Sequence, residues 1–345
     1  MSQVIRVLIV DDSAFVRKVV KEMLSGSPHV EVVGTARDGA EALELVEQLN
    51  PDVITCDLLM PRMDGIDFVR EQMSRKPLPI LILTAMEEDG EKALQALEAG
   101  AVDIVQKPTA LANEKLLVIR EELVEKIKLL ARAPALALRP IIQTPKRISR
   151  ATRAAGKIKI VVIGISTGGP QALRFLLPQF PADFPVPIAV VLHMPVGYIK
   201  VYAEKLNELS QLDVGEVREG DELEAGKVFF AQAGRHLALR RESETKVVAT
   251  LPFAPVESLH RPAADVLFHS AAKCYGNGVL GVVMTGMGDD GKLGAACVKA
   301  EGGTILTEAE ESCVIYGMPR SVVEADLSDE SSRLENMAET IMGKL

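Results

Sequence analysis

The chain has only four cysteines, no long apolar run and no tryptophan. The cysteines are scattered without a C-x-x-C pair, which excludes a zinc or disulfide framework and predicts buried thiols. A membrane span needs about 18 apolar residues, so the strand-sized apolar stretches predict no membrane insertion. The longest of them are Ile160–Ile165, Val186–Leu192 and Val279–Thr285. The first residues run directly into acidic positions and lack a signal-peptide layout, so we expect a cytoplasmic protein.

Positive charge is scarce outside one segment of the chain. Residues 1–130 contain 15 Lys/Arg and 23 Asp/Glu, and residues 160–345 contain 16 and 25. Residues 131–159 contain 8 Lys/Arg and no acid. The simplest partition is two acidic domains with a basic connector. Acidic domains argue against nucleic acid as a partner, because binding phosphates requires Lys and Arg on the contact face.

Strand and helix patterns alternate through residues 1–130. Short apolar strands separated by amphipathic helices predict βαβ units and a parallel sheet. The expected strands are Ile5–Val10, Glu31–Ala36, Val53–Asp57, Ile80–Thr84 and Ile104–Val105. The expected helices are Ser13–Ser25, Gly39–Asn50, Gly65–Arg75, Gly90–Gly100 and Ala112–Leu130.

The second half of the chain alternates as well. The expected strands are Ile160–Ile165, Ile188–His193, Val279–Thr285 and Gly303–Leu306, with a small antiparallel excursion formed by Val228–Ala231, Leu237–Arg240 and Lys246–Thr250. The expected helices are Gln171–Gln179, Tyr198–Ser210, Ala263–Tyr275, Gly291–Ala300 and Arg320–Glu324. We therefore predict an α/β protein with two doubly wound domains, residues 1–130 and 158–345, the second mostly parallel. A basic linker, 131–157, contains three prolines that stiffen it.

Polar residues end the strands of the first domain. Asp11 and Asp12 end the first strand, Asp57 the third and Thr84 the fourth, and Lys107 follows the fifth. In an open parallel sheet these ends meet at one edge, where ligands bind. Three converging carboxylates repel one another unless a cation lies among them, and hard oxygen ligands suit Mg²⁺. Any one Asp could be a helix N-cap. Together the five residues predict a site for a transferred phosphoryl group.

This arrangement resembles the response-regulator receiver domain, a family with a known flavodoxin-like strand order. The resemblance implies that Asp57 is the phosphoacceptor and that Asp11, Asp12 and Asp57 bind Mg²⁺. It implies that Thr84 and Lys107 form the receiver switch. The chain has Ile104 where receivers commonly carry an aromatic residue, which leaves open whether this position alters the switch.

A second motif follows the first strand of the second domain. Gly164-Ile165-Ser166-Thr167-Gly168 fits G-x-S-x-G, a strand-to-helix turn that exposes a nucleophilic serine. Backbone N–H groups at the following helix N-terminus favour negative charge there. The pattern is weak by itself, because a phosphate-binding glycine loop or a plain tight turn has the same form.

A serine nucleophile needs a base and an acid that orients the base. Among five histidines His193 is best placed, because it ends the strand expected beside the serine strand. Asp289 and Asp290 follow a third strand, and an acid there can orient His193 and stabilise its imidazolium. Spacing does not decide which of the two does so.

These residues allow two other interpretations. Gly286–Gly291 formally matches the dinucleotide fingerprint G-x-G-x-x-G, but its two aspartates would repel the pyrophosphate. Asp265 and His269, four residues apart on one helix face, are a fallback acid–base pair.

Together these stretches closely resemble the chemotaxis protein-glutamate methylesterase (CheB) family. The matching segments are Gly164–Pro170, His193–Pro195, Arg261-Pro262 with Asp265–Phe268, Thr285–Gly291, and Ser312–Val314 with Gly317–Pro319. The resemblance implies a catalytic triad of Ser166, His193 and Asp290, with an oxyanion-hole N–H from Met287 and Thr167 lining the site. Two departures are Ala263, where the family usually has Ser, and Gln232-Ala233, where Pro-Gly is common; neither is a triad position.

The function implied is a phosphorylation-activated hydrolase. It would remove methyl esters from glutamate side chains of methyl-accepting chemotaxis receptors and deamidate receptor glutamines, with a chemotaxis histidine kinase as phosphodonor. Mg²⁺ would serve only receiver phosphorylation, and the esterase would need no cofactor. A response regulator whose second domain only binds a partner is the rival hypothesis. A DNA-binding output domain is disfavoured because no helix-turn-helix signal is present.

Overall fold

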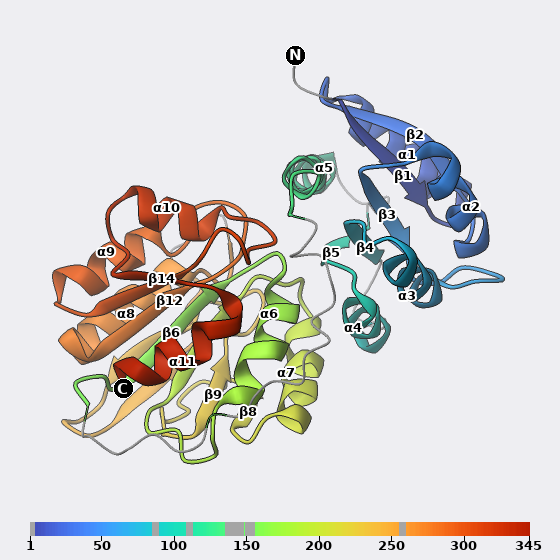
Figure 1. Cartoon of the computed structure of the whole chain (residues 1–345). Coiled ribbons are helices and arrows are strands. Elements are labelled where there is room, and N and C mark those ends of the chain that lie inside the picture. The colour runs from blue at the N-terminus through green and yellow to red at the C-terminus, as the bar shows by residue number, and fades with distance from the viewer. Residues whose placement is uncertain (1–3, 85–89, 108–112, 135–147, 149–155, 255–259) are drawn as a thin grey trace. The chain divides into compact units, whose positions relative to one another are not determined.

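The structure is a computed structural model that forms two compact units, Met1–Ile141 and Ile142–Leu345 (Figure 1). It describes residues 4–84, 90–107, 113–134, 148, 156–254 and 260–345. Most of the expected linker 131–157 lies outside the described residues, so its boundaries stay a prediction. In the part of the chain described, no helix combines the length and apolar character needed to cross a membrane.

The first unit is the predicted five-stranded parallel sheet, with strand order β2-β1-β3-β4-β5. Helix α1 contacts α5, and α3 contacts both α2 and α4, which places helices on both faces. Because both faces are covered, β3 and β4 are buried along their whole length. The strands are β1 (Ile5–Val10), β2 (Val30–Ala36), β3 (Val53–Asp57), β4 (Ile80–Thr84) and β5 (Asp103–Gln106). The helices are α1 (Ala14–Ser25), α2 (Gly39–Leu49), α3 (Gly65–Arg75), α4 (Gly90–Ala99) and α5 (Asn113–Leu130).

The second unit is built on a seven-stranded parallel sheet, with strand order β14-β13-β12-β6-β7-β9-β8. Its strands are β6 (Ile160–Ile165), β7 (Ile188–Leu192), β8 (Asp213–Glu216), β9 (Lys227–Phe230), β12 (Val279–Val283), β13 (Thr304–Glu308) and β14 (Glu330–Ser332). Its helices are α6 (Gly169–Leu176), α7 (Tyr198–Leu209), α8 (Ala264–Tyr275), α9 (Lys292–Ala300), α10 (Met318–Glu324) and α11 (Leu334–Lys344). Short 3₁₀ turns, η2 (Leu177–Gln179) and η3 (Gly276–Gly278), follow α6 and α8.

The antiparallel part is smaller than the sequence predicts. Only β10 (Ala238–Arg241) and β11 (Val247–Thr250) pair in that way among the named strands. The expectation for Val228–Ala231 is wrong, because β9 joins the main sheet in parallel with β7 and β8. Its Val-Phe-Phe run is buried, as suits a strand inside a covered parallel sheet.

Candidate functional site

The turn after β6 presents Ser166 at the start of α6. Gly168 caps the helix with φ +81°, and a side chain there would collide with Val314. Glycine is therefore required at this position of the turn. Gly286 packs so closely that a Cβ would lie 2.8 Å from the Ser166 Cβ. Ser166 is 8% exposed, so the hydroxyl lies in a confined space.

His193 stands beside Ser166 because their strands are neighbours. Ile165 pairs with Leu192, the last residue of β7, and the His193 N–H donates to the Ile165 carbonyl at 3.1 Å. Each side chain is thus the first residue past paired strand ends. On the other side of β6, the Ser166 N–H donates to the carbonyl of Thr285 at 2.9 Å, just after β12.

Asp290 is the acid that contacts His193. Its Oδ2 lies 2.9 Å from His193 Nε2, and both side chains are 9% exposed. Asp289 instead is exposed and pairs with Lys292 at 3.1 Å. The geometry therefore distinguishes the two aspartates that sequence spacing left open.

Contacts with His193 and with backbone N–H groups hold Asp290 in its ionised form. The N–H groups of Ala264 and Asp265, at the start of α8, donate to its two oxygens at 2.6 and 3.0 Å. Burial would raise the pKa of Asp290, but the hydrogen bond from His193 and these N–H groups bring the pKa below its ordinary value. An ionised Asp290 accepts, so His193 Nε2 carries the proton. His193 Nδ1 is then the basic nitrogen; it is buried and has no hydrogen-bond partner among the described residues.

The fallback pair is engaged elsewhere. Asp265 Oδ1 accepts from the N–H groups of Gly291 and Gly294 at 2.9 and 2.6 Å, and thereby caps α9. Burial and the neighbouring Asp290 raise the pKa of Asp265 to about 6. The Nδ1 of His269, an exposed residue, lies 3.2 Å from the Sγ of Cys297. Asp265 therefore has a structural role: its carboxylate caps α9 and its N–H donates to Asp290.

The other residues expected at the site lie in the two turns that flank Ser166. Thr167 is fully buried, and its carbonyl accepts from the Thr285 hydroxyl at 3.0 Å. Met287 is half-buried, one residue after the Gly286 that packs on Ser166. Behind Thr285 lies Glu308, fully buried, whose carboxylate accepts from the Thr285 N–H and the Ser312 hydroxyl, each at 2.9 Å. Burial raises the pKa of Glu308 to about 7.

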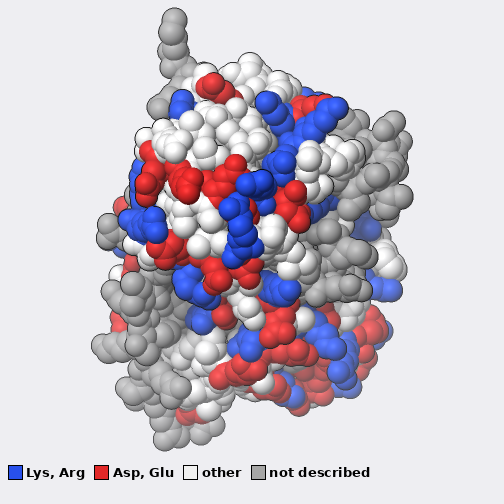
Figure 2. All heavy atoms as spheres, turned by 90° about the vertical axis from the view of Figure 1, so that its right-hand side faces the viewer, with Lys and Arg blue, Asp and Glu red and all other residues white. Residues whose placement is uncertain are grey.

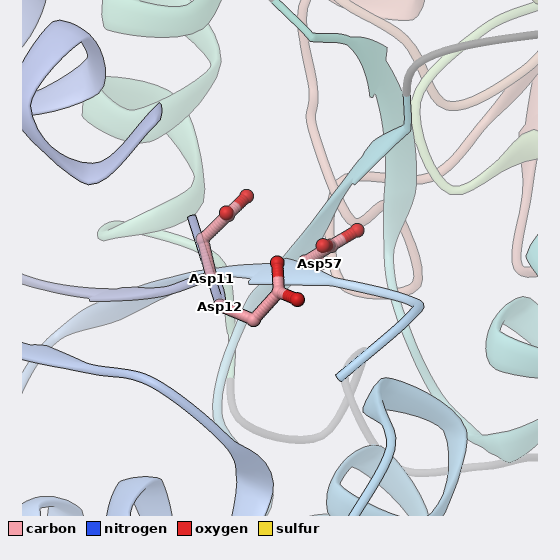
Figure 3. Close-up of side chains that lie close together, drawn as sticks. All are labelled: Asp11, Asp12 and Asp57. Atoms are coloured by element: carbon pink, nitrogen blue, oxygen red, sulfur yellow. The ribbon is translucent and has the colours of Figure 1, made fainter. Parts of the chain in front are cut away.

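The first unit gathers the predicted acidic cluster at its own sheet edge. Oxygens of Asp11, Asp12 and Asp57 lie within 4.8 Å of one another and face a common space (Figure 3). Lys107 Nζ lies 2.9 Å from Asp11 Oδ2 and 2.7 Å from Asp57 Oδ2. Thr84 is buried at the end of β4, and its carbonyl accepts from the Lys107 N–H at 2.7 Å. This oxygen-rich donor set fits a Mg²⁺ ion.

The electrostatic balance of this cluster differs from that of Asp290. Burial and the nearby Asp11 raise the pKa of Asp57 above its ordinary value, although Lys107 acts in the opposite direction. Burial would lower the pKa of Lys107, but its contacts with Asp57 and Asp11 raise it. The lysine therefore stays charged, and the carboxylates still exceed it in number.

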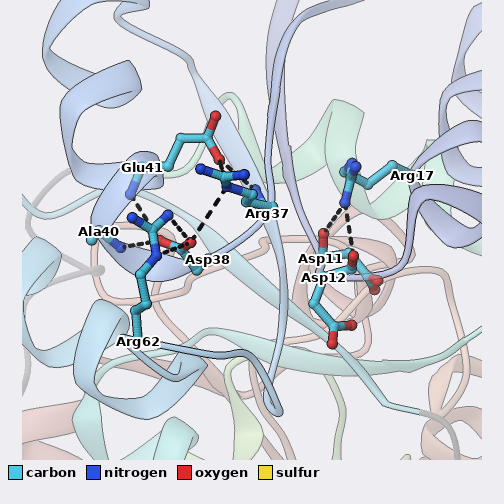
Figure 4. Close-up of polar contacts among 8 residues, drawn as sticks. All are labelled: Asp11, Asp12, Arg17, Arg37, Asp38, Ala40, Glu41 and Arg62. Atoms are coloured by element: carbon cyan, nitrogen blue, oxygen red, sulfur yellow. Dashed lines mark hydrogen bonds and ion pairs between the residues drawn. The ribbon is translucent and has the colours of Figure 1, made fainter.

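Arginines fix the loops around the cluster (Figure 4). Arg17 donates to the backbone carbonyls of Asp11 and Asp12 at 2.7 and 3.0 Å and not to their carboxylates. Arg62, from the loop after β3, pairs with the buried Asp38 that caps α2. The loop that follows Asp57 is thereby tied to the start of α2.

Surface charge is mixed. On the face drawn in Figure 2, basic and acidic side chains of the described residues are interspersed, without a continuous basic field.

Comparison with known proteins assigns the family. The family model for CheB methylesterase matches residues 161–341, and that for the response regulator receiver domain matches residues 7–118. The chain belongs to the CheB methylesterase family. A Myxococcus xanthus protein named protein-glutamate methylesterase/protein-glutamine glutaminase 5 is 48% identical over 334 residues, 96% of either chain. A Pyrococcus horikoshii protein of the same name, without the number, is 39% identical over 349 residues, 99% of this chain and 94% of that protein.

A solved structure agrees with the second unit. The crystal structure of the Thermotoga maritima CheB methylesterase catalytic domain matches with a TM-score of 0.53 at 40% identity. It covers 55% of this chain and 99% of that chain.

Two residues near the CheB-type site escaped the sequence reasoning. Glu308 ends β13, so the strand-end argument used for the first unit would have found it. His260 lies against His193, with ring centroids 4.3 Å apart and planes inclined by 20°. No sequence signal places those two histidines together, because 66 residues separate them and only the folded chain brings them into contact.

Proposed function

We propose that this chain is a phosphorylation-activated protein-glutamate methylesterase that also deamidates protein glutamine. The observation that carries the proposal is the His193–Asp290 pair at 2.9 Å, with the buried Nδ1 of His193 left without a partner beside the serine strand. The names of the relatives supply the substrate class, glutamate methyl esters and glutamines of a protein. The substrate proteins proposed are methyl-accepting chemotaxis receptors.

In the acylation step the Ser166 oxygen attacks the ester carbonyl carbon. His193 Nδ1 takes the hydroxyl proton as the new C–O bond forms, and Asp290 stabilises the resulting imidazolium through Nε2. The oxyanion of the tetrahedral intermediate accepts a hydrogen bond from the Met287 N–H, and Thr167 lines the site. Collapse of the tetrahedral intermediate breaks the bond to methoxide, which takes the proton from His193 and leaves as methanol.

In the deacylation step a water molecule attacks the glutamyl-serine ester. His193 removes a proton from the water and returns it to the Ser166 oxygen as that bond breaks. The products are a free glutamate side chain and the original enzyme. With a glutamine substrate the same steps release ammonia in place of methanol.

The first unit supplies the control. Asp57 is the proposed phosphoacceptor. Its carboxylate attacks the phosphorus atom of a phosphohistidine on a chemotaxis histidine kinase, and the P–N bond to that histidine breaks. Lys107 pairs with the phosphoryl group and Thr84 donates its hydroxyl to it. Asp11, Asp12 and Asp57 would hold Mg²⁺, which supplies charge neutralisation for the entering phosphoryl group. Phosphorylation shifts the equilibrium between a state in which the receiver inhibits the esterase and an active state.

The test is methanol release from methylated receptor membranes, with and without a small-molecule phosphodonor and Mg²⁺. We expect release that rises with phosphodonor, Ser166→Ala protein that is folded and releases nothing, and Asp57→Ala protein that keeps only the unstimulated rate. Methanol release at the same rate with and without the phosphodonor would support the esterase activity and contradict its activation by phosphorylation. A folded wild-type protein that releases no methanol would favour the partner-binding alternative.

A further inference from the structure

A second imidazole lies against the proposed base. The rings of His193 and His260 are stacked, with centroids 4.3 Å apart and an interplanar angle of 20°. Both residues are partly buried, and the His193 side chain is only 9% exposed. The near-parallel contact covers one face of the His193 ring.

The segment that carries His260 also holds the acid. Four residues after His260 the chain enters α8, whose first N–H groups, from Ala264 and Asp265, bind the Asp290 carboxylate. One short stretch, 260–265, therefore contacts His193 through a ring and Asp290 through the backbone.

The hydrogen bond at Nε2 alone does not fix the plane of the His193 imidazole ring. The hydrogen bond from Nε2 to Asp290 fixes the position of one ring atom, and tilting of the ring about that contact would still move Nδ1. A flat partner on the ring face opposes this rotation, because tilting the ring breaks the stacking contact. Small errors in the aim of a reacting group are costly in rate.

We propose that His260 is a positioning residue that holds the imidazole plane of His193 with Nδ1 directed at Ser166. This proposal rests on the proposed esterase function. It assigns His260 no contact with substrate, so its loss acts on kcat rather than on KM.

The test compares three variants of the full-length protein that differ in ring shape. His260→Phe keeps a flat ring, His260→Leu keeps bulk without a flat face, and His260→Ala removes both. The substrate is methylated receptor membranes at constant phosphodonor. We expect kcat to fall about tenfold in His260→Leu and His260→Ala and to stay within about threefold of wild type in His260→Phe. KM should stay unchanged in all three variants. Labelling of Ser166 by a fluorophosphonate probe is expected to slow in the same order.

The controls separate folding, function and positioning. His269→Ala, an exposed histidine on the same helix that His260 precedes, is expected to match wild type, and thermal melting of each variant reports folding. Ser166→Ala tests the esterase itself, and its loss of activity is independent of His260. Three results, each with Ser166→Ala inactive, would contradict the positioning role. They are wild-type kcat in His260→Leu, a kcat for His260→Phe as low as that for His260→Leu, and a higher KM at unchanged kcat.

Discussion

The carboxyl ends of the two parallel sheets differ in how they balance negative charge. In the first unit, Asp11, Asp12 and Asp57 gather around one ammonium group, that of Lys107. In the second unit, Asp290 faces one imidazole and two backbone N–H groups. Burial opposes ionisation at both places, yet the pKa of Asp57 ends above its ordinary value and that of Asp290 below it.

The difference lies in what supplies the compensation. The N–H groups that bind Asp290 belong to a folded helix, so the acid is compensated whenever the protein is folded. At Asp57 the surplus of carboxylates remains until a cation or a phosphoryl group changes the balance. The same sheet topology therefore provides one site that is permanently set and one that responds to a ligand.

Asp290→Asn is expected to have the largest effect. The Asn oxygen can still accept a hydrogen bond from an N–H group of α8. The Asn NH₂ group would then donate a hydrogen bond to His193 Nε2. That contact favours the tautomer with the proton on Nδ1, so the base is lost. We expect kcat for methanol release to fall on the order of 1,000- to 10,000-fold with the protein still folded.

The matched control is Asp289→Asn, because the neighbouring aspartate is exposed and pairs only with Lys292 among the contacts described. An exposed pair of this kind contributes little, so activity and melting temperature should stay at wild-type values. Equal losses in the two variants would contradict the assignment of Asp290 as the acid.

Glu308→Gln extends the comparison to a carboxylate of the second unit whose burial is not fully offset by its hydrogen bonds. The Glu308 carboxylate accepts from one backbone N–H and one hydroxyl, and burial raises its pKa from 4.5 to about 7. Because the folded state favours the protonated form, the stability it adds is complete below pH 4.5 and is lost as the pH rises through about 7. At 1.36 kcal/mol per pH unit, the free energy of unfolding changes by about 3 kcal/mol over that interval.

A neutral glutamine removes this dependence. We expect Glu308→Gln to melt roughly 5–10 °C higher than wild type at about pH 8 and to match it at about pH 4.5. Glu311→Gln, at an exposed carboxylate 3.9 Å from Arg333, should leave both melting temperatures unchanged. A stabilisation of the same size at both pH values would point to packing instead of charge.

Strand-end reasoning accounts for most of what the sequence predicted. Apolar runs such as β6 and β12 are buried on both faces, so their ends could be located, and with them Ser166 and the turn that holds Asp290. The same logic placed Asp11, Asp57 and Lys107 together. Short strands such as β8 and β14 escaped because four and three residues carry too little apolar pattern.

Contacts made by backbone groups were out of reach of the sequence. Ala263 cannot cap α8 with its side chain, and Asp290 binds the first N–H groups of that helix instead. Asp265, which lies in α8, caps α9 in return. Asp290 therefore caps the helix that contains Asp265, and Asp265 caps the helix that follows Asp290. Such a reciprocal arrangement depends on how α8 and α9 pack, and single-residue patterns do not encode it.

Magnesium is expected to give the smallest effect of the three, and it tests the responsive site directly. Binding to the folded state alone stabilises by about 1.4 kcal/mol when the ion exceeds its Kd tenfold. We therefore expect Mg²⁺ to raise the melting transition of the first unit by a few °C, relative to NaCl of equal ionic strength, and to leave the second unit unchanged.

Three variants show whether this stabilisation comes from the acidic cluster. Asp12→Asn and Asp57→Asn each remove an oxygen ligand's charge and should abolish most of the Mg²⁺ effect. Asp67→Asn, at an exposed carboxylate paired with Arg70, should retain it. If Asp67→Asn loses as much, or if both units respond alike, the ion acts by general screening and the contrast between a responsive and a permanently compensated site fails.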